Sequence, residues 1–256
     1  MSTTWHLGGL LEGSPVKQYG IIVLNQPINK NALSAVIESA VMLVCADAGA
    51  NRLMQYDLDA ATKKRLPDAI VGDLDSLTDS AKNHFQNQGV RIVEDSDQYS
   101  TDFTKSLMWM RQEWSKRKGE DEDLDVVVMG GLGGRVDQGF SQIHHLYVVL
   151  QQRDLLRGSI YLLSEQSLSF VLAAGQNELH VNHKVFAEKL GIIPVLGLTH
   201  ISTSGLEWDV FNWPTEFGGQ ISTSNHIRSD LVKIMIHGSR PLVTLELAKC
   251  LCASST

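Results

Sequence analysis

The sequence predicts an α/β domain with a mostly parallel sheet, followed by an all-β sandwich domain. In the first half of the 256-residue chain, short apolar runs rich in Val and Ile alternate with segments of helical period. Unbroken β-branched runs are typical of strands buried on both faces, and their alternation with helices predicts a parallel sheet covered on both sides. After about residue 158, short strand-like runs follow one another without helical periodicity, which favours a sandwich or barrel.

Each expected strand of the first domain ends in a polar or glycine-rich turn. The helical spacing is clearest from Phe103 to Trp114, where apolar residues fall at i, i+4, i+7 and i+11, and the segment from Val136 to Tyr147 repeats it. The expected strands are residues 19–24, 41–46, 68–72, 90–93 and 125–129.

The second domain is expected to hold only short strands separated by Gly, Asn, Ser and Pro turns. We place the boundary after residue 157, which gives an α/β domain of residues 1–157 and a β-sandwich domain of residues 158–256. The expected strands are residues 159–163, 169–172, 178–181, 192–196, 219–222, 233–236 and 242–247.

The composition is that of an ordinary globular protein, with 43% hydrophobic and 20% charged residues. A formal net charge of -7 argues against a nucleic-acid or membrane-surface partner, because both require basic patches. Cys45, Cys250 and Cys252 have no spacing typical of zinc sites or disulfide frameworks, so we expect reduced thiols. Residues 1–11 lack the pattern of a signal peptide, so a cytoplasmic location is expected.

Acidic residues follow nearly every expected strand of the first domain. Ligands gather outside the carboxyl ends of parallel strands. Taken singly, each acid is more often a helix cap, a first-turn acid or a turn residue than a metal ligand. Together they predict a magnesium site, because neighbouring carboxylates repel one another unless a cation lies among them, and Mg²⁺ prefers oxygen ligands. These acids are Asp47, Asp73, Asp75, Asp102 and Asp137.

A glycine-rich loop at residues 130–134 precedes Arg135. Its backbone N–H groups at a helix N-terminus favour anions, and an Arg guanidinium is suited to phosphate. The loop is no P-loop, and Val136 stands where a dinucleotide-binding loop has its third glycine. A tight turn is the alternative. Lys105, one turn after Asp102, is a second candidate cation for phosphate, with a surface ion pair as its alternative.

Six sequence blocks together resemble the thiamine pyrophosphokinase family, in the family's order. The blocks cover roughly residues 20–247. They are residues 45–51 (CADAGAN), 72–76 (GDLDS), 101–105 (TDFTK), 130–138 (GGLGGRVDQ), 202–208 (STSGLEW) and 222–225 (STSN). In one departure, Glu188-Lys189-Leu190 precede the 191–194 segment where the family often has a small residue and Cys.

The resemblance implies transfer of the pyrophosphoryl group of ATP to the hydroxyl of thiamine, giving thiamine diphosphate and AMP. It implies a homodimer with thiamine near the subunit interface and Trp208 stacking on thiamine. The metal is expected at Asp73, Asp75 and Asp102. Catalysis is expected to involve these three acids with Lys105, Arg135 and Asp137. ATP is expected at Asp47, Gly131, Gly133, Gly134, Arg135 and Gln138, and thiamine at Gln98, Thr101, Ser202, Trp208, Ser224 and Asn225.

Two alternatives compete with this interpretation. A glycosyltransferase using a nucleotide sugar would hold its metal with Asp73-Leu74-Asp75, but neither the loop ending in Arg135 nor the β-rich second half is expected there. A thiamine or nucleotide sensor on the same fold would have lost catalysis, although every acid and cation that the reaction requires is present. Asp102 or Asp75 is the candidate for accepting the hydroxyl proton.

Overall fold

The structure contains two compact units that differ in secondary structure. The computed structural model describes residues 2–59 and 65–252, with the backbone only for residues 57–59. Residues 17–165 form an α/β unit, and residues 2–16 belong with residues 166–252 to a β-rich unit. The predicted fold class, an α/β domain and a β-sandwich domain, is confirmed.

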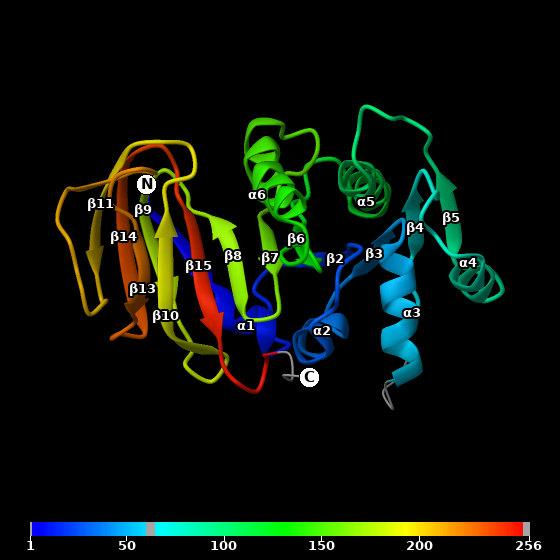
Figure 1. Cartoon of the computed structure of the whole chain (residues 1–256), viewed down its shortest axis with the longest axis horizontal. Coiled ribbons are helices and arrows are strands. Elements are labelled where there is room, and N and C mark those ends of the chain that lie inside the picture. The colour runs from blue at the N-terminus through cyan, green and yellow to red at the C-terminus, as the bar shows by residue number, and fades with distance from the viewer. Residues whose placement is uncertain (1, 60–64, 253–256) are drawn as a thin grey trace. The chain divides into compact units, whose positions relative to one another are not determined.

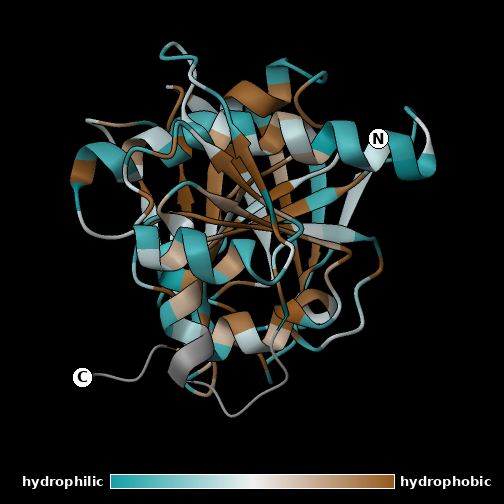
Figure 2. Cartoon of the chain, turned by 90° about the vertical axis from the view of Figure 1, so that its right-hand side faces the viewer, coloured by the Kyte–Doolittle hydropathy of each residue, from teal (hydrophilic) through white to brown (hydrophobic). Residues whose placement is uncertain are grey.

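The α/β unit is built on a parallel sheet with the strand order β7-β6-β2-β3-β4-β5. Every residue of β2, β3 and β6 is buried, which explains why these strands are apolar in the sequence apart from Asp125 at the start of β6. Figure 2 shows these apolar strands between helices. The strands are β2 (Tyr19–Val23), β3 (Met42–Ala46), β4 (Ala69–Gly72), β5 (Arg91–Glu94), β6 (Asp125–Met129) and β7 (Ile160–Leu163).

Helices cover both faces of this sheet. In Figure 1, α5 and α6 lie on one face, and α2, α3 and α4 lie on the other. Asn29, Thr78 and Thr101 cap α2, α4 and α5 by accepting a backbone N–H of the first turn. The helices are α2 (Lys30–Ile37), α3 (Gly49–Asp59), α4 (Asp79–Gln86), α5 (Asp102–Lys118) and α6 (Val136–Gln151).

The strand order reverses between β2 and β6. From β2 the chain adds β3, β4 and β5 on one side, and it then returns to place β6 and β7 on the other side of β2. The chain segments that follow these two adjacent strands therefore run in opposite directions, and a crevice opens beyond the carboxyl ends of β2 and β6. In open α/β sheets this switch point is where ligands bind.

The β-rich unit consists of two sheets around an apolar core. The Trp5 ring lies 4.6 Å from the Phe170 ring, which joins the two sheets, and Trp5 Nε1 donates to Asn177 Oδ1 at 3.0 Å. One sheet has the order β1-β9-β14-β11-β12 and the other β13-β10-β15-β8. The elements are β1 (Ser2–His6), α1 (Leu7–Leu11), β8 (Ser167–Val171), β9 (Gly175–His180), β10 (Phe186–Ile193), β11 (Thr199–Ser204), β12 (Trp213–Thr215), β13 (Ser222–His226), β14 (Leu231–Gly238) and β15 (Leu242–Leu247).

The division of the chain differs from the predicted boundary after residue 157. The strand β7 lies beyond that boundary but pairs in parallel with β6, so it belongs to the α/β unit. At the other end, β1 pairs with β9, which places the N-terminal segment in the β-rich unit. The strand expected at residues 219–222 instead begins at Ser222, and β11 and β12 were not predicted.

Candidate active site

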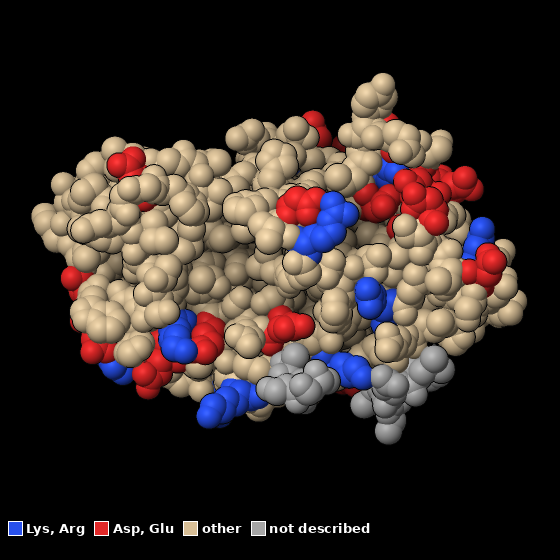
Figure 3. Space-filling model, viewed as in Figure 1, with Lys and Arg blue, Asp and Glu red and all other residues tan. Residues whose placement is uncertain are grey.

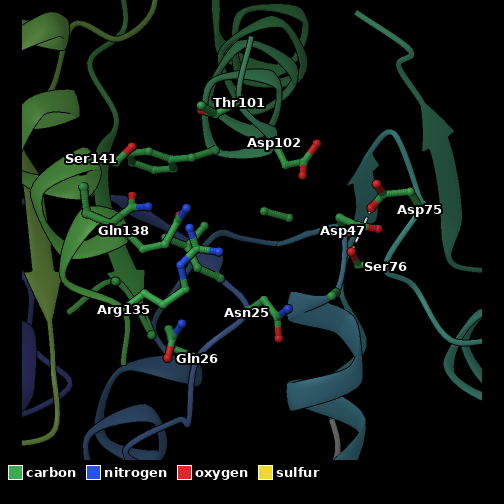
Figure 4. A pocket seen from close by; sticks show the side chains of 17 residues that line it. Asn25, Gln26, Asp47, Asp75, Ser76, Thr101, Asp102, Arg135, Gln138 and Ser141 are labelled. Atoms are coloured by element: carbon green, nitrogen blue, oxygen red, sulfur yellow. Dashed lines mark hydrogen bonds between the residues drawn. The ribbon is translucent and has the colours of Figure 1, made fainter. Parts of the chain in front are cut away.

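A polar cleft of about 410 Å³ opens at the switch point of the α/β unit. It is formed by the segments after β2 and β6, the loops after β3 and β4, the start of α5 and part of α6. Figure 4 shows Arg135 and Gln138 entering from one side, and Asp75 and Asp102 from the other. The lining residues are Leu24, Asn25, Gln26, Ala46, Asp47, Ala48, Asp75, Ser76, Thr101, Asp102, Phe103, Gly130, Gly131, Arg135, Gln138, Ser141 and Gln142.

Three carboxylates meet at the acidic side of this cleft. Oxygen atoms of Asp47, Asp73 and Asp102 all lie within 4.8 Å of one another. They follow β3, follow β4 and begin α5, so the carboxyl ends of neighbouring strands bring them together as predicted. Figure 3 shows acidic side chains gathered on this part of the surface. These oxygens are close enough for the three carboxylates to belong to one cation site.

The close approach of these acids depends on Gly72. A Cβ atom at this position would lie 2.8 Å from Asp47 Cβ and 2.9 Å from Asp102 Oδ1, which leaves no space for a side chain. Asp47 itself has a φ of 42°, a left-handed conformation that is uncommon outside glycine. Asp102 Oδ1 accepts the backbone N–H of Asp73 at 3.3 Å. The backbone, rather than the acids alone, therefore defines the cluster.

Burial and mutual repulsion make the cluster electrostatically unfavourable without a cation. Burial raises the pKa of Asp47, and the charges of Asp102, Asp73 and Asp75 raise it further. The pKa of Asp102 is raised first by burial and then by Asp73. Asp47 is 4% exposed, and its Oδ1 has no hydrogen-bond partner in the described part of the chain. This unpaired buried oxygen and its two acidic neighbours fit a divalent metal ion.

The predicted metal ligand Asp75 lies outside the three-acid cluster but lines the same cleft. Ser76 Oγ donates to Asp75 Oδ1 at 2.7 Å. Asn51 holds the loop by accepting from the backbone N–H of Thr78 and donating to the Ser76 carbonyl. Asp75 is therefore placed beside the cluster on an ordered loop.

Lys105 does not line the cleft. Its ammonium is buried, donates to the Asp95 carbonyl at 2.8 Å and lies 3.5 Å from Asp102 Oδ1. These contacts tie the loop before α5 to Asp102. In this structure Lys105 positions an acid, which differs from the predicted direct contact with phosphate.

The wall opposite the acids carries Arg135 and several carboxamides. Arg135 is exposed and forms two hydrogen bonds with Asp137, one of them 2.6 Å long. Hydrogen bonding to Arg135 lowers the pKa of Asp137, and Asp137 does not line the cleft. Gly130 and Gly131 line it, whereas Gly133 and Gly134 lie further along the loop, with φ values of 140° and 64°.

Sequence analysis did not identify Ser141 and Gln142 of α6, which line this wall, or His145, which contacts a residue of the cleft. Gln142 lines the cleft at 9% exposure, and its Oε1 has no partner among the described residues. His145 is 7% exposed and bonds to Thr101, which also lines the cleft. Both follow Gln138 at the helical spacing i+4 and i+7, and that spacing was the available signal.

Two of the four predicted thiamine residues of the β-rich unit, Trp208 and Asn225, line a separate cavity of about 230 Å³. Trp208 lines it with a 57% exposed side chain. The buried Asn225 holds Trp208 in place, because its side chain accepts from the Trp208 N–H and donates to the Trp208 carbonyl. Thr203, Trp213 and other side chains complete an amphipathic pocket.

Three predicted contact residues lie outside both cavities. Ser202 Oγ accepts the Asn212 N–H at 2.8 Å, which supports the loop before β12. Ser224 is exposed with a φ of 54°. Gln98 is exposed on the loop between β5 and α5, three residues before the cleft-lining Thr101.

Comparison with known proteins covers both units. The family model of the thiamin pyrophosphokinase catalytic domain matches residues 33–156, and that of its vitamin B1 binding domain matches residues 176–243. Thiamine pyrophosphokinase 1 of Oryza sativa subsp. japonica is 33% identical over 228 residues, covering 84% of this chain and 83% of that protein. Thiamine pyrophosphokinase 3 of the same plant is 31% identical over 236 residues, covering 88% and 85%.

Solved structures of the same kind share the fold. Thiamin pyrophosphokinase from Candida albicans superposes with a TM-score of 0.84 at 24% identity, covering 96% of this chain and 94% of that chain. The yeast enzyme gives a TM-score of 0.82 at 24% identity, covering 96% and 91%. With the plant relatives matched over most of their length, this chain belongs to the thiamine pyrophosphokinase family.

Proposed function

We propose that the polar cleft of the α/β unit is where this chain transfers the pyrophosphoryl group of ATP to the hydroxyl of thiamine. The observation that carries the proposal is the cluster of Asp47, Asp73 and Asp102 facing Arg135 across one cleft. Polyphosphate transfer needs positioned cations and donors more than it needs covalent chemistry by the protein. The family assignment supports the reaction and sets the glycosyltransferase alternative aside.

Magnesium is the proposed metal, held by Asp47, Asp73 and Asp102, with Asp75 beside them. Carboxylates combined with substrate phosphates are its usual ligands. Bound there, Mg²⁺ would neutralise charge on the phosphate oxygens. This assignment replaces Asp75 by Asp47 in the predicted ligand set, because Asp47 contributes the buried, unpaired oxygen.

The residues of the opposite wall are proposed to hold the nucleotide. Arg135 is exposed at the cleft, and a small rotation away from Asp137 would present its guanidinium to a phosphate. Gly130 and Gly131 allow the backbone to approach phosphate closely. Gln138 and Gln142 supply amide groups for the nucleoside.

In the proposed reaction, the thiamine hydroxyl oxygen forms a bond to the β-phosphorus while the bond from that phosphorus to the α–β bridging oxygen breaks. AMP leaves with the bridging oxygen. The hydroxyl proton passes to a carboxylate oxygen of Asp75, which lines the cleft outside the three-acid cluster. A carboxylate bound to metal is a poorer base, and this favours Asp75 over Asp102.

Thiamine is proposed to stack on Trp208 in a homodimer. Thiamine is a flat cation, and the face of an indole ring attracts cations. Trp208, Phe211 and Phe217 of the β-rich unit are large apolar side chains exposed to solvent, and association with a second copy would cover such side chains. Asn225 supports this site by fixing the Trp208 backbone.

An assay of AMP and thiamine diphosphate formation tests the proposal. Thiamine-dependent AMP release that stops in EDTA is expected, and Asp73→Asn should abolish turnover while the circular dichroism spectrum stays unchanged. ATP binding without any thiamine-dependent AMP would support the sensor alternative instead. Near-normal turnover of Asp73→Asn at saturating Mg²⁺ would refute the assigned metal site.

A further inference from the structure

His145 is a buried polar residue between the two helices that form the upper layer of the α/β unit in Figure 1. It lies on α6, and its ring meets the Phe103 ring of α5 edge-on at 5.1 Å. Its two ring nitrogens have different partners. Nδ1 lies 2.6 Å from the Ser141 carbonyl, and Nε2 lies 3.1 Å from the hydroxyl oxygens of both Thr101 and Thr104.

These contacts determine the protonation state that the ring needs. A carbonyl oxygen only accepts, so Nδ1 must carry the hydrogen, and Nε2 of the neutral ring is then an acceptor. The Thr104 hydroxyl lies 3.1 Å from the Thr101 hydroxyl, which also accepts the Thr104 N–H. A chain from Thr104 through Thr101 to Nε2 therefore satisfies every group. Burial lowers the pKa of His145, which agrees with a neutral ring.

The network joins the two sides of the cleft. Thr101 is the N-cap of α5, the helix that begins with the cluster acid Asp102. Ser141 and Gln138, on the same helix as His145, line the opposite wall. His145 is thus the side chain that links the capping residue before Asp102 to the helix proposed to face the nucleotide.

We propose that His145 is a positioning residue that holds the start of α5 against α6, so that the metal-binding acids and the nucleotide-binding side chains keep their spacing. The inference rests on the proposed division of the cleft into a metal side and a nucleotide side. His145 does not line the cleft, and its Nε2 already has hydroxyl partners. It is therefore assigned no proton transfer. An error of about 1 Å in such spacing lowers rates by up to about 100-fold.

Two amide substitutions separate the two hydrogen bonds of the ring. In His145→Asn, the amide nitrogen stands near the position of Nδ1 and still donates to the Ser141 carbonyl, but no atom reaches the threonines. In His145→Gln, the longer side chain places an amide oxygen near Nε2 and still accepts from Thr101. His144→Asn is the matched control, because His144 is the exposed neighbour on the same helix.

Steady-state kinetics of thiamine diphosphate formation should show a kcat about tenfold lower in His145→Asn, with a KM for Mg·ATP raised about fivefold. The KM for thiamine should change less than twofold. His145→Gln should recover most of kcat, and the His144→Asn control should match the parent protein. A smaller folded fraction would lower the apparent kcat without changing the KM for Mg·ATP, so the shift in KM separates positioning from instability.

Equal kinetics in His145→Asn and the parent protein would overturn the inference, as would equal losses in the Asn and Gln variants. If His145→Asn does not fold, the same comparison can be made at Thr104, whose hydroxyl also lies near Nε2. Thr104→Val should lower kcat about threefold, whereas Thr104→Ser, which keeps the hydroxyl, should not. A parent protein without thiamine-dependent AMP release would contradict the proposed function rather than this inference.

Discussion

Asp47→Asn is expected to stabilise the protein and to inactivate it. Asp47 is buried, and among the described residues its Oδ1 has no hydrogen-bond partner. A carboxylate oxygen of Asp47 lies within 4.8 Å of oxygens of two other carboxylates. At that separation two unit charges repel by about 3.5 kcal/mol at an effective dielectric constant of about 20. Protonation of the cluster relieves part of this repulsion in the parent protein. We therefore expect Asp47→Asn to raise the free energy of unfolding of the metal-free protein by about 1–2 kcal/mol. Asn tolerates a positive φ, so the backbone at residue 47 is retained.

The gain depends on pH in a defined direction. The folded-state pKa of Asp47 is raised, so between the unfolded and folded pKa values the folded protein binds more protons. The free energy of unfolding of the metal-free protein therefore falls as the pH rises through this window. Asp47→Asn should show a smaller fall, because residue 47 no longer titrates.

Thermal unfolding in EDTA at neutral pH measures the effect, with Asp123→Asn as the control at an exposed acid. A Tm about 4 °C higher is expected for Asp47→Asn and no change for the control. Added Mg²⁺ should raise the Tm of the parent protein more than that of Asp47→Asn. Turnover should fall at least about 100-fold. A Tm that is unchanged or lower, together with retained turnover, would refute the assignment of Asp47 to the metal site.

Three further outcomes are expected. Gly72→Ala should lower turnover at least about 100-fold and weaken activation by Mg²⁺, because the new Cβ would lie 2.8 Å from Asp47 Cβ; unchanged kinetics would contradict the close approach. Gln142→Leu should raise the KM for ATP about tenfold and leave the KM for thiamine unchanged, because Gln142 lines the cleft and its Oε1 has no partner among the described residues. A change in the KM for thiamine alone would contradict the assignment of Gln142 to the nucleotide. Trp208→Ala should raise the KM for thiamine about tenfold without shifting the KM for ATP, and an unchanged KM for thiamine would remove Trp208 from the site.

The parallel sheet was predictable because its strands are buried on both faces. Residues 126–129 (VVVM) are an unbroken apolar run, and they form all of β6 except its first residue, Asp125. The strands β1 and β11 were not predictable in the same way. β1 is only five residues long and pairs with β9, which lies far along the chain. β11 (THISTS) has Ile201 as its one apolar residue, so it lacks the pattern of a strand. Pairing partners far apart in the sequence leave no local pattern.

The position of the acids at one edge of the sheet was predictable, but the identity of the three that form the cluster was not. Each acid follows a strand, and parallel strands end at one edge of the sheet. Whether Asp47 or Asp75 joins Asp73 and Asp102 depends on the close approach at Gly72 and on the positive φ of Asp47. Neither feature has a sequence signal of its own. The role of His145 was hidden for the same reason, since it depends on side chains of two helices.

The charges around the acid cluster explain why a buried lysine belongs beside a cation site. The Lys105 ammonium lies 3.5 Å from Asp102 and also binds the Asp95 carbonyl, so it cannot leave the site to follow a phosphate without breaking both contacts. When all three carboxylates of the cluster are ionised, this ammonium balances one of them, and the remaining charge of minus two equals that of one divalent ion with opposite sign. A second lysine would weaken the attraction of the cluster for the ion. Without any lysine, the three carboxylates would repel one another more strongly in the metal-free protein. The fold thus retains enough negative charge to attract a divalent ion while limiting the repulsion that opposes folding without it.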